Sequence, residues 1–462
     1  MNTTQVCGSG ASRLTVLVLA GLISGGCTVN ATGSPDGGGG GGTTSTTGDD
    51  GGVGKTADGG ASDTTDGGGG AVNEDGATSA SDSSAPTGGD DGGPGEGGVT
   101  PEPPGCIKNL YGTYTVRTDG VAVNEGSSET VVIDDASGTN STPLTGVQSV
   151  QQQELAACAV VTGGTVKCWQ EDATNGNAYG QLGNGTKTPI AVYRAVTVLT
   201  AANTPLSNVV SLAPGEVSNA ACAVTSDSKL WCWGALTWLA NGGTQDYAGY
   251  AQMISKDGQT PLTGVIQAAI GENVGCALVQ GSPNNSVWCW GSGGYDELGQ
   301  GTSTNQQYPV EVKGLTSPTK VMLSLANRNV GCNGCGGPAV AACAMDGDSV
   351  LCWGANNNGA TGGSPNVNPV PAATQVVTST MTVLRGVTDI QEGWVGFGVV
   401  RNDGTIWLWG SPDGNTAYAK TYGVTNVVQL GWAGGNSAGL RYLTSDGIYH
   451  TGMTSPTVSC SF

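Results

Sequence analysis

Histidine is nearly absent from this sequence of 462 residues: His450 is the single one, and charged residues make up only 11% of the chain. Nucleophilic triads and general acid–base pairs usually need a histidine, so its scarcity argues against most hydrolytic chemistry. We expect His450 to be a surface or hydrogen-bonded residue. Basic residues are also few, with 16 Lys and Arg against 36 Asp and Glu. Because nucleic-acid phosphates are bound by Lys and Arg, the composition argues against nucleic-acid binding.

The sequence also lacks motifs for zinc, phosphate loops or dinucleotides in a strand–turn–helix setting, so we expect no metal site and no cofactor. Two pairs of adjacent acids, Asp134–Asp135 and Asp296–Glu297, have the residue types that a glycosidase needs. They lie in turn and loop contexts, where solvated charge is the ordinary explanation. We therefore expect the protein not to be an enzyme.

Large apolar residues are almost missing between residues 28 and 105, which are mainly Gly, Asp, Ser and Thr. Such a segment cannot bury enough apolar surface to offset the entropy of the chain. It carries about half of the net negative charge of the chain, and Lys55 is its one basic residue. The sequence therefore predicts an acidic, Gly-rich disordered linker over residues 27–105.

Long apolar runs are lacking too, apart from Leu14–Ile23, which is too short to span a bilayer and reads as the core of a secretory signal over residues 1–26. The small residues Ser24-Gly25-Gly26 before Cys27 resemble the lipobox of bacterial lipoproteins. The resemblance implies cleavage before Cys27 and acylation of its sulfur, which would anchor the chain in a membrane. The alternative is an ordinary cleaved signal that leaves Cys27 as a free thiol. Thr28 and Val29 lack the Asp associated with inner-membrane retention, so we expect an exported protein on the outer membrane, facing the cell surface or the periplasm.

Beyond residue 105 the chain repeats a strand–turn–strand unit. Seven units align on their tight turns, at residues 114–123, 158–169, 222–233, 276–290, 343–353, 399–409 and 440–449. The turns fall about 43 to 64 residues apart, which is the range for one four-stranded propeller blade. The sequence therefore predicts an all-β, seven-bladed β-propeller.

Each element of the unit has a chemical reason. Gly120, Gly164, Gly404 and Gly447 stand where a short hairpin loop needs a positive φ, and Ser228 takes that place in the third unit. The last Trp of each unit is expected to pack between neighbouring blades. These residues are Trp169, Trp233, Trp290, Trp353 and Trp409.

The Cys-Ala-x and Cys-Trp-Gly hairpins, with the loops Tyr179-Gly-Gln-Leu-Gly-Asn-Gly-Thr186 and Tyr295-Asp-Glu-Leu-Gly-Gln-Gly-Thr302, resemble the repeats of the RCC1 (regulator of chromosome condensation) family. The resemblance spans roughly residues 106–462 and implies a seven-bladed propeller. A WD40-type propeller is the alternative, but its Trp-Asp ending is absent. The family's exchange activity toward a nuclear GTPase transfers poorly to an exported chain. Its secreted members imply that the scaffold can be a protein-binding disc.

The cysteines are consistent with export. Of the fourteen, Cys7 falls in the signal and Cys27 at the lipid site, which leaves an even number for disulfides. Opposed hairpin positions predict four bonds within blades: Cys158–Cys168, Cys222–Cys232, Cys276–Cys289 and Cys343–Cys352. Cys106 and Cys460 would latch the first and last blades. Cys332 and Cys335 form a Cys-x-x-Cys pair, which we interpret as a structural disulfide; a redox centre and half a zinc site are the alternatives.

Aromatic residues outside the hairpins are the candidates for contact with a partner. They are Trp238, Tyr247, Tyr250, Trp394 and Trp432, which we expect to lie exposed in irregular segments. The leading hypothesis is a monomeric, lipid-anchored, surface-displayed propeller that binds an extracellular protein or glycan. One alternative is a propeller hydrolase or lyase that acts on extracellular polymer with paired carboxylates. Another is a scaffold subunit of an envelope complex.

Overall fold

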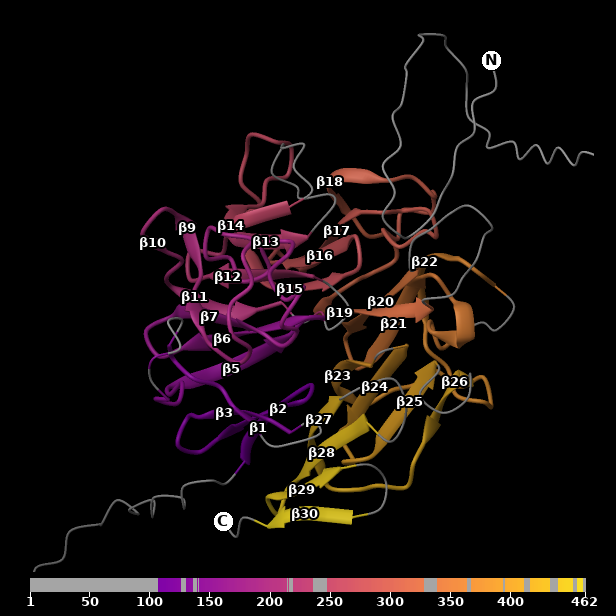
Figure 1. Cartoon of the computed structure of the whole chain (residues 1–462). Helices are drawn as coiled ribbons and strands as arrows, with labels where there is room; N and C mark the ends of the chain where they lie inside the picture. The colour runs from indigo at the N-terminus through magenta and orange to yellow at the C-terminus, as the bar shows by residue number, and fades with distance from the viewer. Residues whose placement is uncertain are drawn as a thin grey trace, which may run out of the picture. The chain divides into compact units, whose positions relative to one another are not determined.

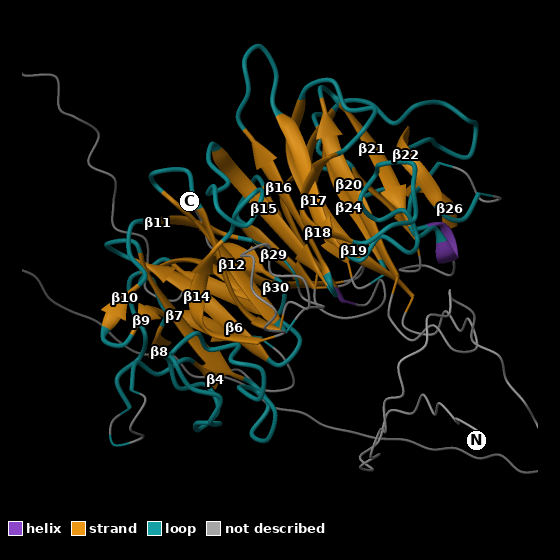
Figure 2. Cartoon of the chain, turned by 90° about the horizontal axis from the view of Figure 1, so that it is seen from above, coloured by secondary structure: helices purple, strands orange, loops and turns teal. Residues whose placement is uncertain are grey.

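The computed structural model describes residues 107–459, with gaps at 126–129, 136–138, 140, 214, 216–218, 236–246, 328–338, 364–366, 394, 411–415, 433–438 and 452–454. Seven four-stranded antiparallel sheets follow one another along this part of the chain (Figure 1). Strands and their connecting loops make up nearly all of it (Figure 2). The predicted all-β, seven-bladed propeller is therefore confirmed. Several predictions concern residues outside those described: the predicted signal peptide and linker, Cys27, Cys106, Cys332, Cys335 and Cys460.

Each blade is a meander whose strands pair in chain order. Blades 1 to 3 contain β1 (Ile107–Tyr111), β2 (Tyr114–Arg117), β3 (Ala122–Asn124), β4 (Thr130–Val131), β5 (Val147–Gln152), β6 (Ala156–Val161), β7 (Thr165–Gln170), β8 (Val196–Thr197), β11 (Val209–Leu212), β12 (Ala220–Thr225), β13 (Leu230–Ala235) and β14 (Tyr247–Met253). A small hairpin, β9 (Leu199–Ala201) with β10 (Thr204–Pro205), lies between blades 2 and 3 in the sequence.

Blades 4 to 7 repeat the same order. Their strands are β15 (Val265–Gly271), β16 (Val274–Val279), β17 (Ser286–Gly291), β18 (Gln306–Glu311), β19 (Pro318–Asn327), β20 (Ala339–Asp346), β21 (Ser349–Gly354), β22 (Val370–Gln375), β23 (Val387–Gly393), β24 (Gly396–Arg401), β25 (Ile406–Gly410), β26 (Thr416–Thr421), β27 (Val427–Trp432), β28 (Leu440–Thr444), β29 (Ile448–Thr451) and β30 (Ser455–Ser459). One 3-10 turn, η1 (Asn357–Gly359), precedes β22.

The hairpin turns have the predicted backbone. Gly164 has φ 73° and Gly404 has φ 72°, both in the left-handed region where glycine costs least. Ser228 holds φ 58° at the same turn position in blade 3, so the serine adopts the conformation that its neighbours reach with glycine. The four predicted intrablade disulfides are also present, with Cα–Cα distances of 4.0 to 4.1 Å.

The hairpin tryptophans form the core between blades, as predicted. Trp169, Trp233, Trp290, Trp353 and Trp409 are each at most 1% exposed. Every one joins a hydrophobic cluster with residues of the preceding blade; Trp353, for example, packs with Cys276 and Leu278 of blade 4. Because each of blades 2 to 6 buries its indole against the preceding blade, these blades complete one another's cores.

The first strand of each blade lies innermost, and these strands contact one another in a ring that includes β27 and β1. Figure 1 shows the first blade (indigo) beside the last (yellow). Gln429 on β27 accepts a hydrogen bond from Leu110 N and donates one to Leu110 O, both at 3.3 Å. Gln267 on β15 binds Val321 of the next blade in the same way, at 2.8 and 2.7 Å. Blade 7 therefore meets blade 1 with the same contact that joins blades 4 and 5.

A second contact stabilises this junction between blade 7 and blade 1, which we call the seam. The buried guanidinium of Arg441 on β28 donates to Thr113 O and Glu125 O of blade 1, at 3.1 and 3.2 Å. The side chains of Ile107, Leu110, Leu443 and Tyr449 form an apolar cluster across the same seam. The described part of the ring is thus closed by hydrogen bonds and apolar packing. In that part, no helix is long and apolar enough to span a bilayer.

Candidate functional site

The Gly-rich loop that follows β7 locks blade 2 onto blade 3. Trp233 Nε1 donates a hydrogen bond to Gln181 O at 2.9 Å, and Gly185 N donates to Gly249 O on β14 at 2.8 Å. A Cβ atom at Gly183 would lie 2.8 Å from Trp233 Cδ1, so only glycine fits against the indole. The loop is therefore held rigidly beside the outer strand of the next blade.

A cluster of aromatic side chains lies on this rigid junction. Tyr179 from the loop stacks on Tyr247 from β14, with ring centroids 5.2 Å apart. Lys187 Nζ lies 4.8 Å from the centre of the Tyr247 ring, within the range of a cation–π contact. Tyr250 packs on Gly185, since a Cβ atom there would lie 2.5 Å from the Tyr250 ring. We call Tyr179, Lys187, Tyr247 and Tyr250 the tyrosine patch.

The patch is unusual in its exposure. Tyr179 is 36% exposed and Tyr247 is 40% exposed. In the described part of the chain, the other large apolar side chains with comparable exposure are all aliphatic: Val192, Val210, Ile266, Val367, Met381 and Val428. Two exposed aromatic rings in mutual contact are the kind of surface that partners bind, because such rings give large contact area at low conformational entropy.

The predicted contact aromatics are therefore only partly brought together. Tyr247 and Tyr250 share the patch, although they lie in strand β14 and not in an irregular segment as expected. The expectation for Trp432 is wrong: it ends strand β27 and is 2% exposed. Its ring lies within 3.1 to 3.3 Å of the Cβ position of Gly393 on β23, so it fills the gap that this glycine leaves. Trp238 and Trp394 lie outside the described residues.

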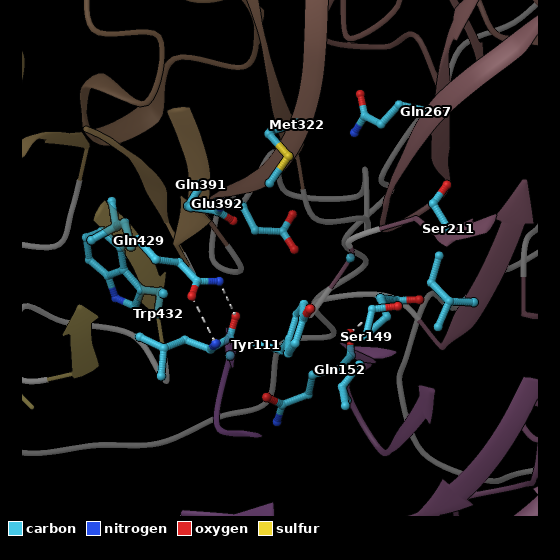
Figure 3. Close-up of a pocket in the computed structure, with 18 of the residues that line it drawn as sticks. Tyr111, Ser149, Gln152, Ser211, Gln267, Met322, Gln391, Glu392, Gln429 and Trp432 are labelled. Carbon is cyan, nitrogen blue, oxygen red and sulfur yellow. Dashed lines mark hydrogen bonds between the residues drawn. The ribbon is translucent and has the colours of Figure 1, made fainter. Parts of the chain in front are cut away.

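A cavity of about 320 Å³ lies among the seven innermost strands (Figure 3). Most of its polar lining is uncharged, from Tyr111, Ser149, Gln151, Gln152, Ser211, Gln267, Gln391 and Gln429. Glu392 is the one acidic residue among its described lining residues, and Figure 3 shows the Glu392 carboxylate pointing into the cavity. Lys320 also lines it, but Lys320 Nζ is paired with Asp389 Oδ1 at 2.5 Å.

The acid pairs do not behave as the sequence suggested. Asp134 is exposed and pairs with Lys167 at 2.8 Å, as expected for a surface carboxylate. The expectation of solvated charge is wrong for Asp296 and Glu297, which are 7% and 1% exposed. Their loop is pressed against blade 5, where Glu297 O accepts a hydrogen bond from Trp353 Nε1 at 2.8 Å. Burial raises the pKa of Glu297 to about 7, and the hydrogen bond from Tyr295 N to its carboxylate opposes this shift.

A second acid, the half-buried Glu171, joins blades 1 and 2. Tyr114 donates its phenol proton to Glu171 Oε1 at 2.5 Å and accepts a hydrogen bond from Trp169 Nε1 at 2.8 Å. Burial raises the pKa of Glu171 to about 7, and the hydrogen bond from Tyr114 opposes this shift. Both acids have a structural role at a blade junction, and neither lines the central cavity.

His450 is a packed residue, in line with its expected role. Its ring stacks on Tyr442 with centroids 4.5 Å apart, and Nε2 lies 3.5 Å from Thr444 Oγ1. No group of three or more His, Cys, Asp or Glu side chains with the arrangement of a metal site occurs among the residues that the structure describes.

Some residues of these sites could not be identified from the sequence. Tyr179 and Lys187 read as parts of a repeated loop, and their meeting with Tyr247 depends on how blade 3 sits against blade 2. Gln151 and Glu392 stand in two strands that are more than two hundred residues apart. One sequence signal marks the innermost strands, which line the cavity. It is the recurrence of Val-x-Ser or Val-x-Gln at their start, as at Val147, Val209 and Val427.

Comparison with known proteins agrees with this architecture. The family model named regulator of chromosome condensation (RCC1) repeat matches residues 284–324, which belong to blades 4 and 5. E3 ubiquitin-protein ligase HERC2 is 29% identical in Homo sapiens and 28% identical in Mus musculus over 156 residues, which are 33% of this chain and 3% of the relative. This chain therefore covers a small part of those relatives.

Solved structures resemble the chain more extensively but at low identity. The structure of human WBSCR16 superposes with a TM-score of 0.50 and 16% identity, over 70% of this chain and 83% of the other. Prp20p from Saccharomyces cerevisiae gives a TM-score of 0.48 and 16% identity, over 68% of this chain and 75% of the other. At these identities the likeness to WBSCR16 establishes the fold alone.

Proposed function

We propose that this chain, a seven-bladed β-propeller with RCC1 repeats, is a non-enzymatic binding module that holds a protein or glycan partner against its tyrosine patch. The observation that carries the proposal is the exposed stack of Tyr179 on Tyr247, with Lys187 over the Tyr247 ring. Tyrosine is enriched at binding hot spots, and its ring also stacks well on apolar faces of sugars. The junction beneath the patch is rigid, so little entropy is lost when a partner is bound.

The N-terminal sequence motivates a proposal for the position of the module. We propose that Cys27 carries the lipid and that residues 27–105 serve as an acidic tether. A single propeller on such a tether would act as a monomer and reach a partner outside the membrane. Its negative charge favours partners other than nucleic acid.

The alternative of a hydrolase or lyase has less support. Acid–base cleavage of a glycosidic bond uses two carboxyl groups roughly 5 to 10 Å apart across the substrate. The described lining of the central cavity offers one carboxylate, Glu392. The half-buried Glu171 carboxylate accepts a hydrogen bond from Tyr114 of blade 1, and the buried Glu297 carboxylate accepts one from Tyr295 N of its own loop. A scaffold role in an envelope complex would use the same tyrosine patch and is a form of the binding function.

The test is partner capture with a matched pair of variants. The full chain would be applied to a glycan array and to secreted and cell-surface protein fractions. The affinity of any captured partner for the unchanged chain would then be compared with its affinity for the double variant Tyr179→Ala/Tyr247→Ala. We expect at least a tenfold loss of affinity, since removal of a hot-spot aromatic costs about 2 kcal/mol or more. Met381→Ala is the control, because Met381 is 63% exposed but lies in the connection between blades 5 and 6, outside the tyrosine patch.

Two results would contradict the proposal. One is the absence of a specific partner in both the glycan and the protein arm. The other is a partner that binds the double tyrosine variant as tightly as it binds the unchanged chain.

A further inference from the structure

The innermost strands of the seven blades share one polar position around the propeller axis. A register shift between the first and third residues of each innermost strand gives the third residue the same place in every blade. All of these third residues except the first and sixth line the central cavity. They are, in blade order, Asn109, Ser149, Ser211, Gln267, Lys320, Asp389 and Gln429.

Two glutamines at this position tie their blade to the next one. The amide of Gln429 accepts a hydrogen bond from Leu110 N and donates one to Leu110 O (Figure 3). Gln267 binds Val321 N and Val321 O in the same way, at 2.8 and 2.7 Å. A carboxamide therefore fits both backbone groups of one residue on the neighbouring innermost strand.

Blade 2 lacks this carboxamide, because Ser149 is too short to supply it. Leu212 on β11 is the residue that would receive it: Leu212 faces Ala223 across its sheet, as Val321 faces Ala344. The strands β5 and β11 are in contact, and both Ser149 and Leu212 line the cavity. No side chain of the described residues binds Leu212 N or Leu212 O. The backbone groups that a glutamine binds elsewhere are thus open to a group from outside the chain.

A second observation concerns the same strand, β5. Gln151 lines the cavity and is 4% exposed, and its Nε2 donates to Gln152 O at 2.7 Å. Among the described residues, no donor reaches Gln151 Oε1. Buried polar atoms are normally paired, so the hydrogen bonding of the lining is incomplete on the β5 side of the cavity.

The size and the remaining lining of the cavity suit a slim side chain. Its volume of about 320 Å³ lies near the lower end of the range for small-molecule sites, about 300 to 1,000 Å³. Tyr111, Met322 and Leu430 add apolar surface for an alkyl stem. Lys320 is paired with Asp389 at 2.5 Å.

We propose that the cavity on the propeller axis binds a primary carboxamide on a slim alkyl chain, such as a glutamine side chain, through Leu212 N and Leu212 O beside Ser149. A carboxamide has an acceptor oxygen and N–H donors, so it reproduces the pair of bonds made by Gln267 and Gln429. A carboxylate lacks the donor and an ammonium group lacks the acceptor, so neither makes both bonds.

The experiment is saturation-transfer NMR and isothermal titration of the full chain with L-glutamine and with Nα-acetyl-glutamine methylamide. The Nα-acetyl methylamides of glutamate and methionine are the comparisons, because they keep the length of the side chain and lose the carboxamide. We expect saturable one-to-one binding of at least one glutamine probe, and binding of the comparisons weaker by about tenfold or more. Binding of L-glutamine alone would identify a small-molecule site, and binding of the derivative would identify a site for a peptide side chain.

Ser149→Gln supplies the missing carboxamide from the chain itself. It should weaken binding of the glutamine probes about tenfold or more, and it should raise the urea midpoint of unfolding, since two hydrogen bonds are gained. Val428→Gln is the matched control. It adds a glutamine to the innermost strand of blade 7 at a residue that is 57% exposed and does not line the cavity, so it should change neither the binding nor the midpoint.

Gln267→Ser is the second variant, and it tests the proposal even if Ser149→Gln fails to fold. It gives blade 4 the serine of blade 2 and leaves Val321 N and Val321 O without their amide. The urea midpoint should fall, and the number of glutamine probes bound by each chain should rise from one to two. Circular dichroism checks that each variant keeps its strands.

The proposal is overturned if neither glutamine probe binds, in which case the cavity is only the water-filled axis of the propeller. Equal binding of the glutamate derivative, equal binding by Ser149→Gln, or a single site in Gln267→Ser would each overturn it as well. The Tyr179→Ala/Tyr247→Ala variant should bind the glutamine probes normally, so this proposal and the proposed function can fail independently.

Discussion

The loops at residues 179–186 and 295–302 occupy the same place in blades 2 and 4, yet only the first displays an aromatic surface. Their anchoring is the same. The backbone oxygens of Gln181 and Glu297 accept hydrogen bonds from the tryptophans of the next blade, at 2.9 and 2.8 Å. Gly185 N and Gly301 N donate to the outer strand of that blade, at 2.8 and 2.9 Å.

The two loops differ in what the next blade brings against them. Gly185 N binds Gly249 O, so the following residue, Tyr250, packs on the loop. Gly301 N binds Pro371 O, and the residue that follows there is Ala372. Tyr179 lies exposed on Tyr247, whereas Tyr295 packs against the hydrophobic core of blades 5 and 6.

The repeat therefore fixes the position of the loop, and the side chains of the neighbouring strand determine whether the loop displays an aromatic surface. The same backbone hydrogen bonds hold both loops, so function can diverge through one or two side chains on β14 or β22. A binding surface on this fold is therefore a property of a pair of blades.

The largest effect on the free energy of unfolding is expected from substitutions of Glu297 and Gln181, a buried acid and a buried amide at equivalent positions of the two loops. Burial raises the pKa of Glu297 from 4.5 to about 7. Between these pH values the folded chain holds a proton that the unfolded chain has lost, so the free energy of unfolding falls as the pH rises from about 4.5 to about 7. Glu297→Gln should raise the free energy of unfolding at pH 8 by on the order of 3 kcal/mol at most, and change it little at pH 4.

The reciprocal substitution, Gln181→Glu, tests the same effect in the other loop. Gln181→Glu should lower stability at pH 8 by a similar amount, because Gln181 is fully buried at the equivalent position. Urea unfolding followed by tryptophan fluorescence at several pH values measures both variants. Glu171 will keep part of the pH dependence, since the pKa of its carboxyl is also raised to about 7. A pH profile of Glu297→Gln identical to that of the unchanged chain would disprove the role of Glu297.

A smaller effect is expected from alanine at matched glycines. Gly185 and Gly301 have φ 82° and 74°, so alanine strains both, but its methyl group would meet the Tyr250 ring only at Gly185. We expect Gly301→Ala to cost about 1 kcal/mol and Gly185→Ala about 2 to 3 kcal/mol. Thermal unfolding compares them, and Tyr250→Ala should reduce the excess cost at Gly185. Equal costs at the two glycines would show that Tyr250 does not press on the loop.

The smallest effect concerns the hairpin of blade 3. Ser228 adopts φ 58°, where blade 2 has Gly164 at φ 73°. Ser228→Gly should stabilise the chain by about 0.5 to 1 kcal/mol, because glycine reaches this region without steric cost. A shift of the unfolding midpoint in urea measures it. Destabilisation would mean that contacts of the serine outweigh the strain.

Local chemistry allowed much of the fold to be predicted. Turn residues, alternating apolar positions and paired cysteines lie within about a dozen residues of each other, so the hairpins and the four intrablade disulfides could be identified directly. The candidate site was harder to predict. Trp432 looked like an exposed loop residue, but it is buried because β23 presents Gly393 to its ring.

The amino-acid pattern was enough to establish the repeat: the position of each turn, the pairing of the hairpin cysteines, and the tryptophan that each of blades 2 to 6 packs against the preceding blade. These features depend on residues close together along the chain. Only the tertiary structure decided which side chains meet across blades, such as Tyr179 with Tyr247, and which groups line the axis, such as Gln151 with Glu392. The physical reason is that both sites form where separate strands converge, and the packing angle between blades is set by the whole ring.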